Sequence, residues 1–185
     1  LYPDLGDAFD TIAAAVERLY ERDQAGVLNL STLDSIAAAW LVPRIGKFRP
    51  LHPDIDVRIS TTDQVIDFLS DGIDMALRYG TGPYPGMEKV LLMNETLFPV
   101  VSPSLIEKFG SLDKPADLVR FPLLHDDMRD DWGVWMEAAG VSGIDVSRGL
   151  SFTHSVHVQQ AAVAGEGVAL GRSVLTADDL SAGLL

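Results

Sequence analysis

The sequence predicts an α/β fold built around a parallel sheet. Strand-like and helix-like stretches alternate after residue 26, an order typical of parallel strands joined by right-handed crossovers. The clearest example is 28–48, LNLSTLDSIAAAWLVPRIGKF, in which Leu28 and Leu30 alternate with polar residues as in a half-buried strand. Apolar residues at helical spacing follow directly. Because the strand–helix cycle begins again near 97–102, we expect a second subdomain from there.

The composition excludes several kinds of protein. The 185 residues include 27 acidic and 14 basic side chains, and this formal charge of -13 opposes contact between this stretch and nucleic-acid phosphate. Cysteine is absent, which excludes disulfides and thiolate metal ligands and fits the cytoplasm. No apolar run approaches the length of a membrane span. Since the chain starts at Leu1 without Met, we expect a piece of a longer protein.

The first 25 residues carry a heptad pattern. Five apolar residues are spaced four, three, four and three apart: Leu5, Phe9, Ile12, Val16 and Leu19. This spacing predicts either a coiled-coil seam or an amphipathic helix packed on its own domain. Because a polar joint follows at 22–26, we favour a linker helix that pairs with a partner helix.

The remaining elements are predicted from short apolar runs and their flanking residues. Thr62, Ser102 and Ser173 are expected to cap helices, and Gly165 is expected to end one. Beyond the opening unit, strands are expected at 56–60, 73–78, 90–92, 97–101, 123–125, 150–152 and 167–171, and helices at 62–70, after Ser102, before Gly140, at 154–164 and after Ser173.

Polar side chains gather where the first strand meets its helix. Ser31, Thr32 and Ser35 lie at this junction, where the free N–H groups of a helix and nearby hydroxyls can bind a small polar or anionic ligand. Helix capping alone would explain one of these hydroxyls. Arg78 can bind a carboxylate or pair with Asp74 or Asp71.

A second strand-to-helix junction repeats this chemistry. Thr153 and Ser155 lie at a predicted helix start, and two such starts facing one ligand would favour an anionic group. His154 and His157 are three apart and could chelate a metal, but no third ligand is spaced near them. The acidic run at 126–131 lacks the glycine and terminal Glu of a calcium loop, so we expect a solvated loop.

The motifs of common enzymes are absent from the sequence. There is no HExxH, no GxSxG, and no Lys-Ser/Thr after Gly165-Glu166-Gly167. We therefore expect no catalytic residues, no metal and no cofactor. A domain that binds a small molecule and transmits that event is the predicted class.

Four stretches in order carry a family resemblance. They are SIAAAWLVPR at 35–44, DMALRYG at 74–80, VSP at 101–103 and QAAVAGEGVALGR at 160–172. Together they resemble the effector-binding domain of LysR-type transcriptional regulators, in the branch similar to the glycine-cleavage activator. The resemblance covers the whole chain, with residues 1–25 similar to the family's linker helix.

The resemblance implies two Rossmann-like subdomains with a ligand cleft between them, as in type 2 periplasmic binding proteins. It implies a linker or dimerisation helix at 1–25, subdomain I at 26–97, and subdomain II at 98–185 without its C-terminal return to subdomain I. Carried over by position, the ligand-binding residues are Ser31, Thr32, Ser35, Arg78, Tyr79, His125, Thr153, His154 and Ser155.

The same resemblance implies a function. The chain would sense a small, polar or anionic effector and change how subunits of a homodimer or homotetramer are arranged. DNA would be bound by an N-terminal winged helix-turn-helix domain outside this stretch. The alternative is a stand-alone solute-binding protein of a transport system, which has no need of the heptad helix.

Overall fold

The computed structural model describes residues 26–80, 82–126 and 131–185. The chain divides into two compact units. Unit 1 comprises the described residues up to Ala37 together with Leu41–Thr81, and unit 2 comprises Ala38–Trp40 together with Gly82–Leu185. The linker helix expected at 1–25 lies outside the described residues, and the subdomain boundary expected at residue 97 stays a prediction.

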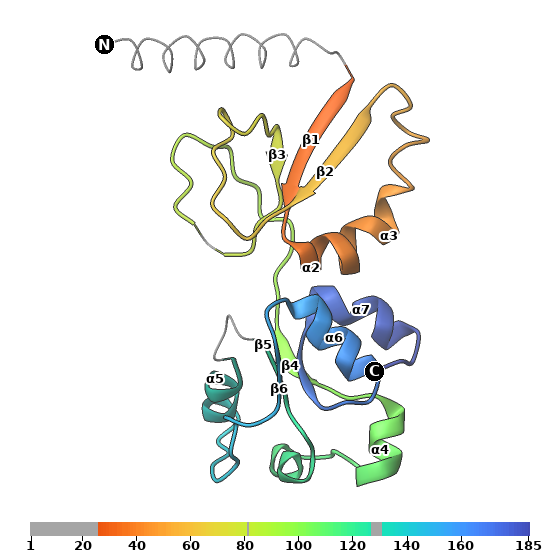
Figure 1. The fold of residues 1–185 in the computed structure, drawn as a ribbon, viewed down its shortest axis with the longest axis vertical. Helices are drawn as coiled ribbons and strands as arrows, with labels where there is room; N and C mark the ends of the chain where they lie inside the picture. The colour runs from red at the N-terminus through yellow and green to blue at the C-terminus, as the bar shows by residue number, and fades with distance from the viewer. Residues whose placement is uncertain (1–25, 81, 127–130) are drawn as a thin grey trace, which may run out of the picture. The chain divides into compact units, whose positions relative to one another are not determined.

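Unit 1 is built on a three-stranded parallel sheet, as predicted (Figure 1). The strands are β1 (Val27–Thr32), β2 (Asp56–Thr61) and β3 (Met75–Ala76), in the order β2-β1-β3. Leu30 of the central strand pairs with Ile59 on one side and with β3 on the other. A parallel sheet brings the carboxyl ends of its strands to one edge, so the residues at the end of β1 lie at that edge.

The helical stretch after β1 changes type along its length. It runs through α2 (Asp34–Ile36), a π-helical turn η1 (Ala37–Leu41) and α3 (Val42–Ile45), and its buried side chains are those of Ala37 and Leu41. Pro43 has no N–H to donate to a carbonyl four residues earlier, and the helix is wider than an α-helix in the turn before it. None of the predicted hydroxyls caps this helix, since its N-cap is Leu33.

The helix predicted at 62–70 is wrong. This stretch forms bends and turns, and Val65, expected on a buried face, is fully exposed. The reason is local competition from polar side chains. Thr62 Oγ1 accepts the N–H two residues on, Asp67 Oδ1 accepts two later N–H groups, and Asp71 Oδ2 accepts the N–H of Asp67. These bonds use N–H groups that an α-helix would need.

Two strands predicted around this region are also shorter or missing. The strand expected at 73–78 is reduced to β3, and 90–92 forms no strand. Val90, Leu91 and Leu92 are 78%, 74% and 55% exposed. In the described part of the chain, no neighbouring strand pairs with them, and an isolated apolar run has no ladder to join.

In its described residues, unit 2 has four strands in two pairs. They are β4 (Leu97–Val100), β5 (Leu124–Asp126), β6 (Leu150–Phe152) and β7 (Ala169–Arg172). The pair β4-β7 is antiparallel and the pair β5-β6 is parallel, and a parallel bridge between Leu123 and Val168 links the two pairs. Strands predicted at all four places are confirmed.

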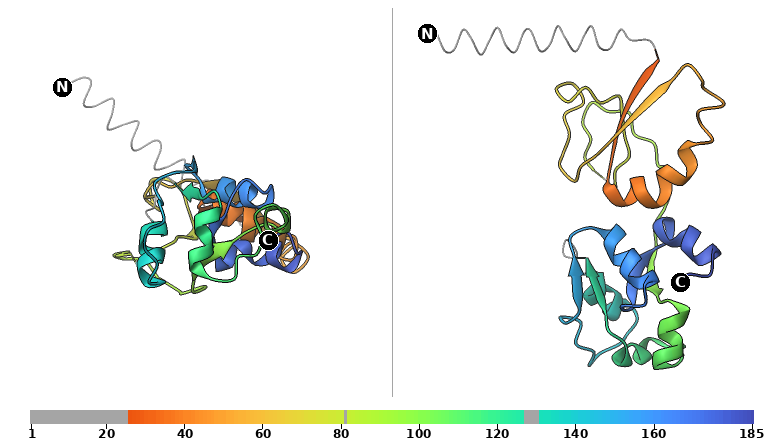
Figure 2. Two further views of the ribbon diagram at one scale, coloured as in Figure 1. Left: turned by 90° about the horizontal axis from the view of Figure 1, so that it is seen from below. Right: turned by 45° about the vertical axis from the view of Figure 1, so that its right-hand side comes forward.

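Among the described residues, four α-helices and a short 3-10 helix surround these strands. They are α4 (Pro103–Phe109), the 3-10 helix η2 (Pro115–Arg120), α5 (Asp131–Ala138), α6 (Ser155–Val163) and α7 (Ser173–Ser181). Helices α6 and α7 lie side by side in both figures, and the side chain of Gln159 in α6 donates to the carbonyl of Leu175 in α7 (Figures 1 and 2).

The predicted helix signals in unit 2 are mostly confirmed. Ser102 caps α4, because its Oγ accepts the N–H of Leu105. Gly165 follows α6 with φ of 79°, a left-handed conformation that favours glycine. The predicted cap at Ser173 is wrong, because its Oγ accepts the N–H of Thr96 instead and thereby holds the start of β4 against α7.

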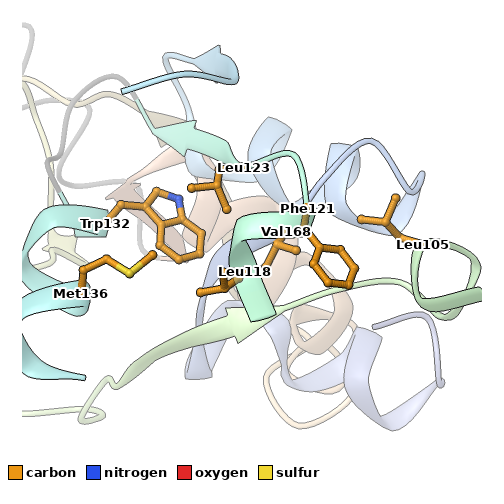
Figure 3. Packing of buried hydrophobic residues seen from close by; sticks show 7 residues of the cluster. All are labelled: Leu105, Leu118, Phe121, Leu123, Trp132, Met136 and Val168. Atoms are coloured by element: carbon orange, nitrogen blue, oxygen red, sulfur yellow. The ribbon is translucent and has the colours of Figure 1, made fainter. Parts of the chain in front are cut away.

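The core of unit 2 forms around the tryptophan of α5 (Figure 3). Trp132 is 4% exposed and its indole Nε1 donates to the carbonyl of Leu124 over 2.8 Å. Buried side chains from five segments gather here: Leu105, Leu118, Phe121, Leu123, Trp132, Met136 and Val168. The core therefore fixes α5 against β5, which contains the predicted site residue His125.

Candidate functional site

The first candidate region is the carboxyl end of β1 in unit 1. Ser31 and Thr32 were expected at the junction between the first strand and its helix; both belong to the strand, and both are completely buried. The strand β1 therefore continues to Thr32, two residues before α2 begins. Ser35 is the second residue of that short helix and is half-buried.

Arg78 is brought to this end of the sheet from 47 residues away. Its Nη2 donates to Ser31 Oγ over 2.8 Å and its Nη1 donates to the carbonyl of Thr62 over 2.5 Å. Of the two proposed ion-pair partners, Asp74 accepts the backbone N–H and side-chain amide of Asn29, and Asp71 accepts a backbone N–H in its own turn. The guanidinium thus positions the hydroxyl of Ser31 and the end of β2.

Thr32 differs from its neighbours in having a buried polar atom without a partner. Its Oγ1 makes no hydrogen bond within the described residues, and the side chain is 0% exposed. A buried hydroxyl without a partner destabilises a folded chain by roughly 1–3 kcal/mol. Such an atom is therefore a candidate for contact with a ligand.

Tyr79, the last predicted residue in unit 1, is 50% exposed.

The second candidate region lies in unit 2, where β5 ends and α6 begins. His125 is in β5, and its Nε2 lies 3.0 Å from the carbonyl of Arg148, which can only accept. Thr153 is exposed, and His154 is the half-buried N-cap of α6 without a side-chain capping bond. Ser155 Oγ donates to Asp126 Oδ2 over 2.5 Å, which joins the start of α6 to the end of β5.

A small hollow of about 30 Å³, partly open to solvent, lies within unit 2. Its apolar walls come from β4, β5, β7, α5, α6 and α7. Its polar lining is Asp126, Asp131, Ser155, Gln159, Arg172 and Thr176. Of the residues predicted for this region only Ser155 lines the hollow, so His125, Thr153 and His154 belong to its surroundings.

Two residues of this region were missed at the sequence level. Asp126 was placed in a solvated acidic loop, but it ends β5 and binds Ser155. Arg172 was assigned no role, yet it is 6% exposed and its guanidinium is paired with Glu95 and with Asp131. Their location in the sequence could have identified both residues, because each comes at the end of a predicted strand, where binding residues of α/β proteins gather.

The structure also tests for a metal site and for a membrane-spanning helix. Within the described ranges, no three His, Asp or Glu side chains are grouped as a metal ion would need. His154 and His157 contact each other edge to face, with ring centroids 5.7 Å apart. Among the helices of the described chain, none has the length and apolar character needed to cross a membrane.

Solved structures define the class of this fold. The effector domain of AmpR of Pseudomonas aeruginosa matches with a TM-score of 0.70 and 32% identity, over 86% of this chain and 76% of that one. The regulatory domain of CrgA of Neisseria meningitidis matches in fold with a TM-score of 0.73 and 20% identity, over 86% of this chain and 78% of that one. The chain thus has the type 2 periplasmic-binding-protein-like fold of effector-binding domains.

The sequence comparisons give the family. The model described as the LysR substrate binding domain matches residues 21–185, so the chain belongs to that family. The glycine cleavage system transcriptional activator of Escherichia coli K12 is 40% identical over 98% of this chain, and AmpR of Rhodobacter capsulatus is 37% identical over 92%. The chain spans 60% and 57% of the lengths of these two relatives.

Proposed function

We propose that this chain is the effector-sensing part of a cytoplasmic LysR-type transcriptional regulator. The family match and relatives named as transcriptional activators support this proposal. DNA would be bound by a winged helix-turn-helix domain outside this stretch, since the stretch itself carries a formal charge of -13. The relatives named above are regulators, so we propose neither an enzymatic activity nor the transport role considered as the alternative.

The effector would bind at the carboxyl end of β1. The single observation that carries this assignment is the buried, unpartnered Oγ1 of Thr32. Beside it in the same strand, Ser31 is held by Arg78, so a hydroxyl and a guanidinium lie near one strand end. These groups can donate to or accept from a small polar or anionic molecule. The predicted residues Ser35 and Tyr79 would complete this part of the site.

Sensing requires that the effector favour one subunit arrangement over another. An effector with equal affinity for two arrangements of a homodimer or homotetramer would transmit nothing to the DNA-binding domains. We propose that the bound effector stabilises one such arrangement. A coupling of about 1–3 kcal/mol would change DNA binding or promoter geometry measurably.

The experiment is a thermal-shift screen of this chain with amino acids, small carboxylates and aromatic acids, followed by titration of the best compounds. The test variant is Thr32→Val, which exchanges the hydroxyl for a methyl of similar size. Since it removes an unsatisfied buried hydroxyl, we expect the free chain to gain about 1 kcal/mol of stability. We expect the same variant to lose most of the ligand-induced rise in melting temperature.

The control is Thr96→Val, since Thr96 is exposed and its contacts with Ser173 run through its backbone. This variant should keep the full ligand response. If Thr32→Val binds every active compound as well as the wild type does, the hydroxyl has only a structural role and the assigned site is wrong.

A further inference from the structure

The hydroxyl of Ser31 takes part in a hydrogen bond whose direction is fixed by its partner. A guanidinium carries N–H donors and no acceptor, so in the 2.8 Å bond between Arg78 Nη2 and Ser31 Oγ the nitrogen donates. Arg78 Nη1 is anchored on the carbonyl of Thr62 over 2.5 Å, which holds the guanidinium in place. The bond occupies one lone pair of the Ser31 oxygen and leaves the hydroxyl hydrogen to be donated elsewhere.

No acceptor takes that hydrogen within the residues that the structure describes. There, the bond from Arg78 is the single hydrogen bond of Ser31 Oγ, and the side chain is 0% exposed. Other serine hydroxyls of the chain donate to a carboxylate, as those of Ser111, Ser147 and Ser155 do. A buried donor without an acceptor destabilises the free chain, so the hydrogen of Ser31 is suited to a bond with a ligand.

The direction of the bond from Arg78 decides which partner suits Ser31. Hydrogen bonds that run in one direction along a chain strengthen one another, and here the chain runs from the guanidinium through the hydroxyl oxygen and out along its O–H bond. An acceptor oxygen continues this chain, and an ionised oxygen makes the stronger bond. An ammonium group would have to donate to the remaining lone pair of Ser31, next to the positive charge of Arg78.

We infer that Arg78 selects the effector through Ser31. By committing this hydroxyl to donate, it favours an effector that presents a carboxylate to the end of β1. Ser31 is then the residue that touches the effector, and Arg78 is a positioning residue that acts through it. The inference rests on the proposed function and narrows its ligand class from small polar or anionic molecules to carboxylates.

The first test needs no variant. Titration calorimetry compares three acids with their primary amides: alanine with alaninamide, succinate with succinamide, and benzoate with benzamide. Benzylamine, which carries an ammonium group in place of the carboxylate, completes the panel. We expect an acid to bind at least about tenfold more tightly than its amide, because only the acid presents an ionised acceptor. An amide or amine that binds as tightly as its acid overturns the inference, as does a panel in which no acid binds.

The second test separates the hydroxyl of Ser31 from the charge of Arg78. Ser31→Ala keeps the guanidinium and removes the hydroxyl, so it should lose most of the acid preference, defined as the ratio of the dissociation constants of amide and acid. The matched control is Ser60→Ala, at the exposed position of β2 that pairs with Ser31, which should keep the full ratio. If the effector contacted Arg78 directly, Ser31→Ala would keep the ratio, and this result overturns the inference.

The role of Arg78 is tested by two substitutions. Arg78→Met keeps the apolar stem and removes the donors, so Ser31 can donate or accept and most of the ratio should be lost. Arg78→Lys retains a group that only donates and should restore part of the ratio, which a general loosening of the strand ends would not do. In the Ser31→Ala background, Arg78→Met should change the ratio no further. Full retention of the ratio in Arg78→Met overturns the inference.

Failure of this inference is distinguishable from failure of the proposed function. Successive side chains of a strand project to opposite faces, so Ser31 and Thr32 would contact different atoms of the effector. If Ser31→Ala keeps the full ratio while Thr32→Val loses binding, the inference is wrong and the proposed function stands.

Discussion

Arg78 and Ser31, 47 residues apart, meet at the carboxyl end of the parallel sheet through a 2.8 Å hydrogen bond from Nη2 to Oγ. The other terminal nitrogen of Arg78 donates to the carbonyl of Thr62, the residue that follows β2. One side chain therefore connects the ends of two strands. The same edge carries Thr32 and its unpartnered hydroxyl. The shape of the proposed effector site in unit 1 thus depends on Arg78.

Replacement of Arg78 by alanine should lower the stability of the chain. The substitution removes the two hydrogen bonds that the charged guanidinium donates. A hydrogen bond from a charged donor contributes about 1.5–3 kcal/mol to stability. We expect the free energy of unfolding, measured by urea denaturation followed by circular dichroism, to fall by roughly 3 kcal/mol. Arg58→Ala, at an exposed position of β2, should leave it almost unchanged. Equal effects of the two substitutions would contradict the role given to Arg78.

Replacement of Arg172 should lower the stability of the chain more than replacement of Arg78 does. Its removal leaves Glu95 and Asp131, which are 16% and 27% exposed, without their shared cation. Breaking a buried ion pair in this way typically destabilises a protein by about 3–5 kcal/mol. Arg172→Met keeps the apolar stem and isolates the charge effect. The control is Arg148→Met, at an exposed position of the same unit. A thermal unfolding midpoint that is equal in the two variants would refute this account.

The indole nitrogen of Trp132 offers a test of the core. Trp132→Phe keeps an aromatic ring but removes the donor to the buried carbonyl of Leu124 and leaves a small void. We expect a loss of about 2–3 kcal/mol in urea denaturation. Trp135→Phe, at a half-buried position whose ring meets Trp132 edge to face, should lose less than half of that. If Trp135→Phe lost more stability than Trp132→Phe, Trp132 would not be the centre of the core.

Asp145 gives a prediction in pH. The hydroxyl and the backbone N–H of Ser147 both donate to its carboxylate, which holds the pKa of Asp145 below its ordinary value. Because the pKa is lowered on folding, the stabilisation is present above the ordinary aspartate pKa and is lost as pH falls through the lowered one. Ser147→Ala should raise the pKa of Asp145 in a carboxyl NMR titration, whereas Ser142→Ala should not. An unchanged pKa in Ser147→Ala would refute the assigned cause.

The sequence predicts the elements of unit 2 well because their signals are local. Ser102 before Pro103 starts α4, and Gly165 ends α6, and each acts through its own backbone or its near neighbours. In unit 1 the local signals conflict. The apolar spacing at 62–70 favours a helix, but Thr62 and Asp67 bind nearby N–H groups and the turns prevail.

The candidate site was only partly predictable for a different reason. The polar residues at the end of β1 could be found from the sequence, but their burial inside the strand could not. Asp126 and Arg172 acquire their roles from partners far along the chain, since Ser155 is 29 residues from Asp126 and Glu95 is 77 residues from Arg172. The spacing of residues in a single sequence does not show which distant residues will come into contact.

The most direct test of the central claim is an NMR titration of the chain with the tightest compound from the thermal-shift screen. The account predicts that the methyl and amide signals of Thr32 and the amide signal of Ser31 shift and saturate with the same dissociation constant as calorimetry gives. It predicts that Thr32→Val removes this saturation. If the compound binds to saturation while the signals of Ser31 and Thr32 stay unchanged, the end of β1 is not the effector site and the account is wrong.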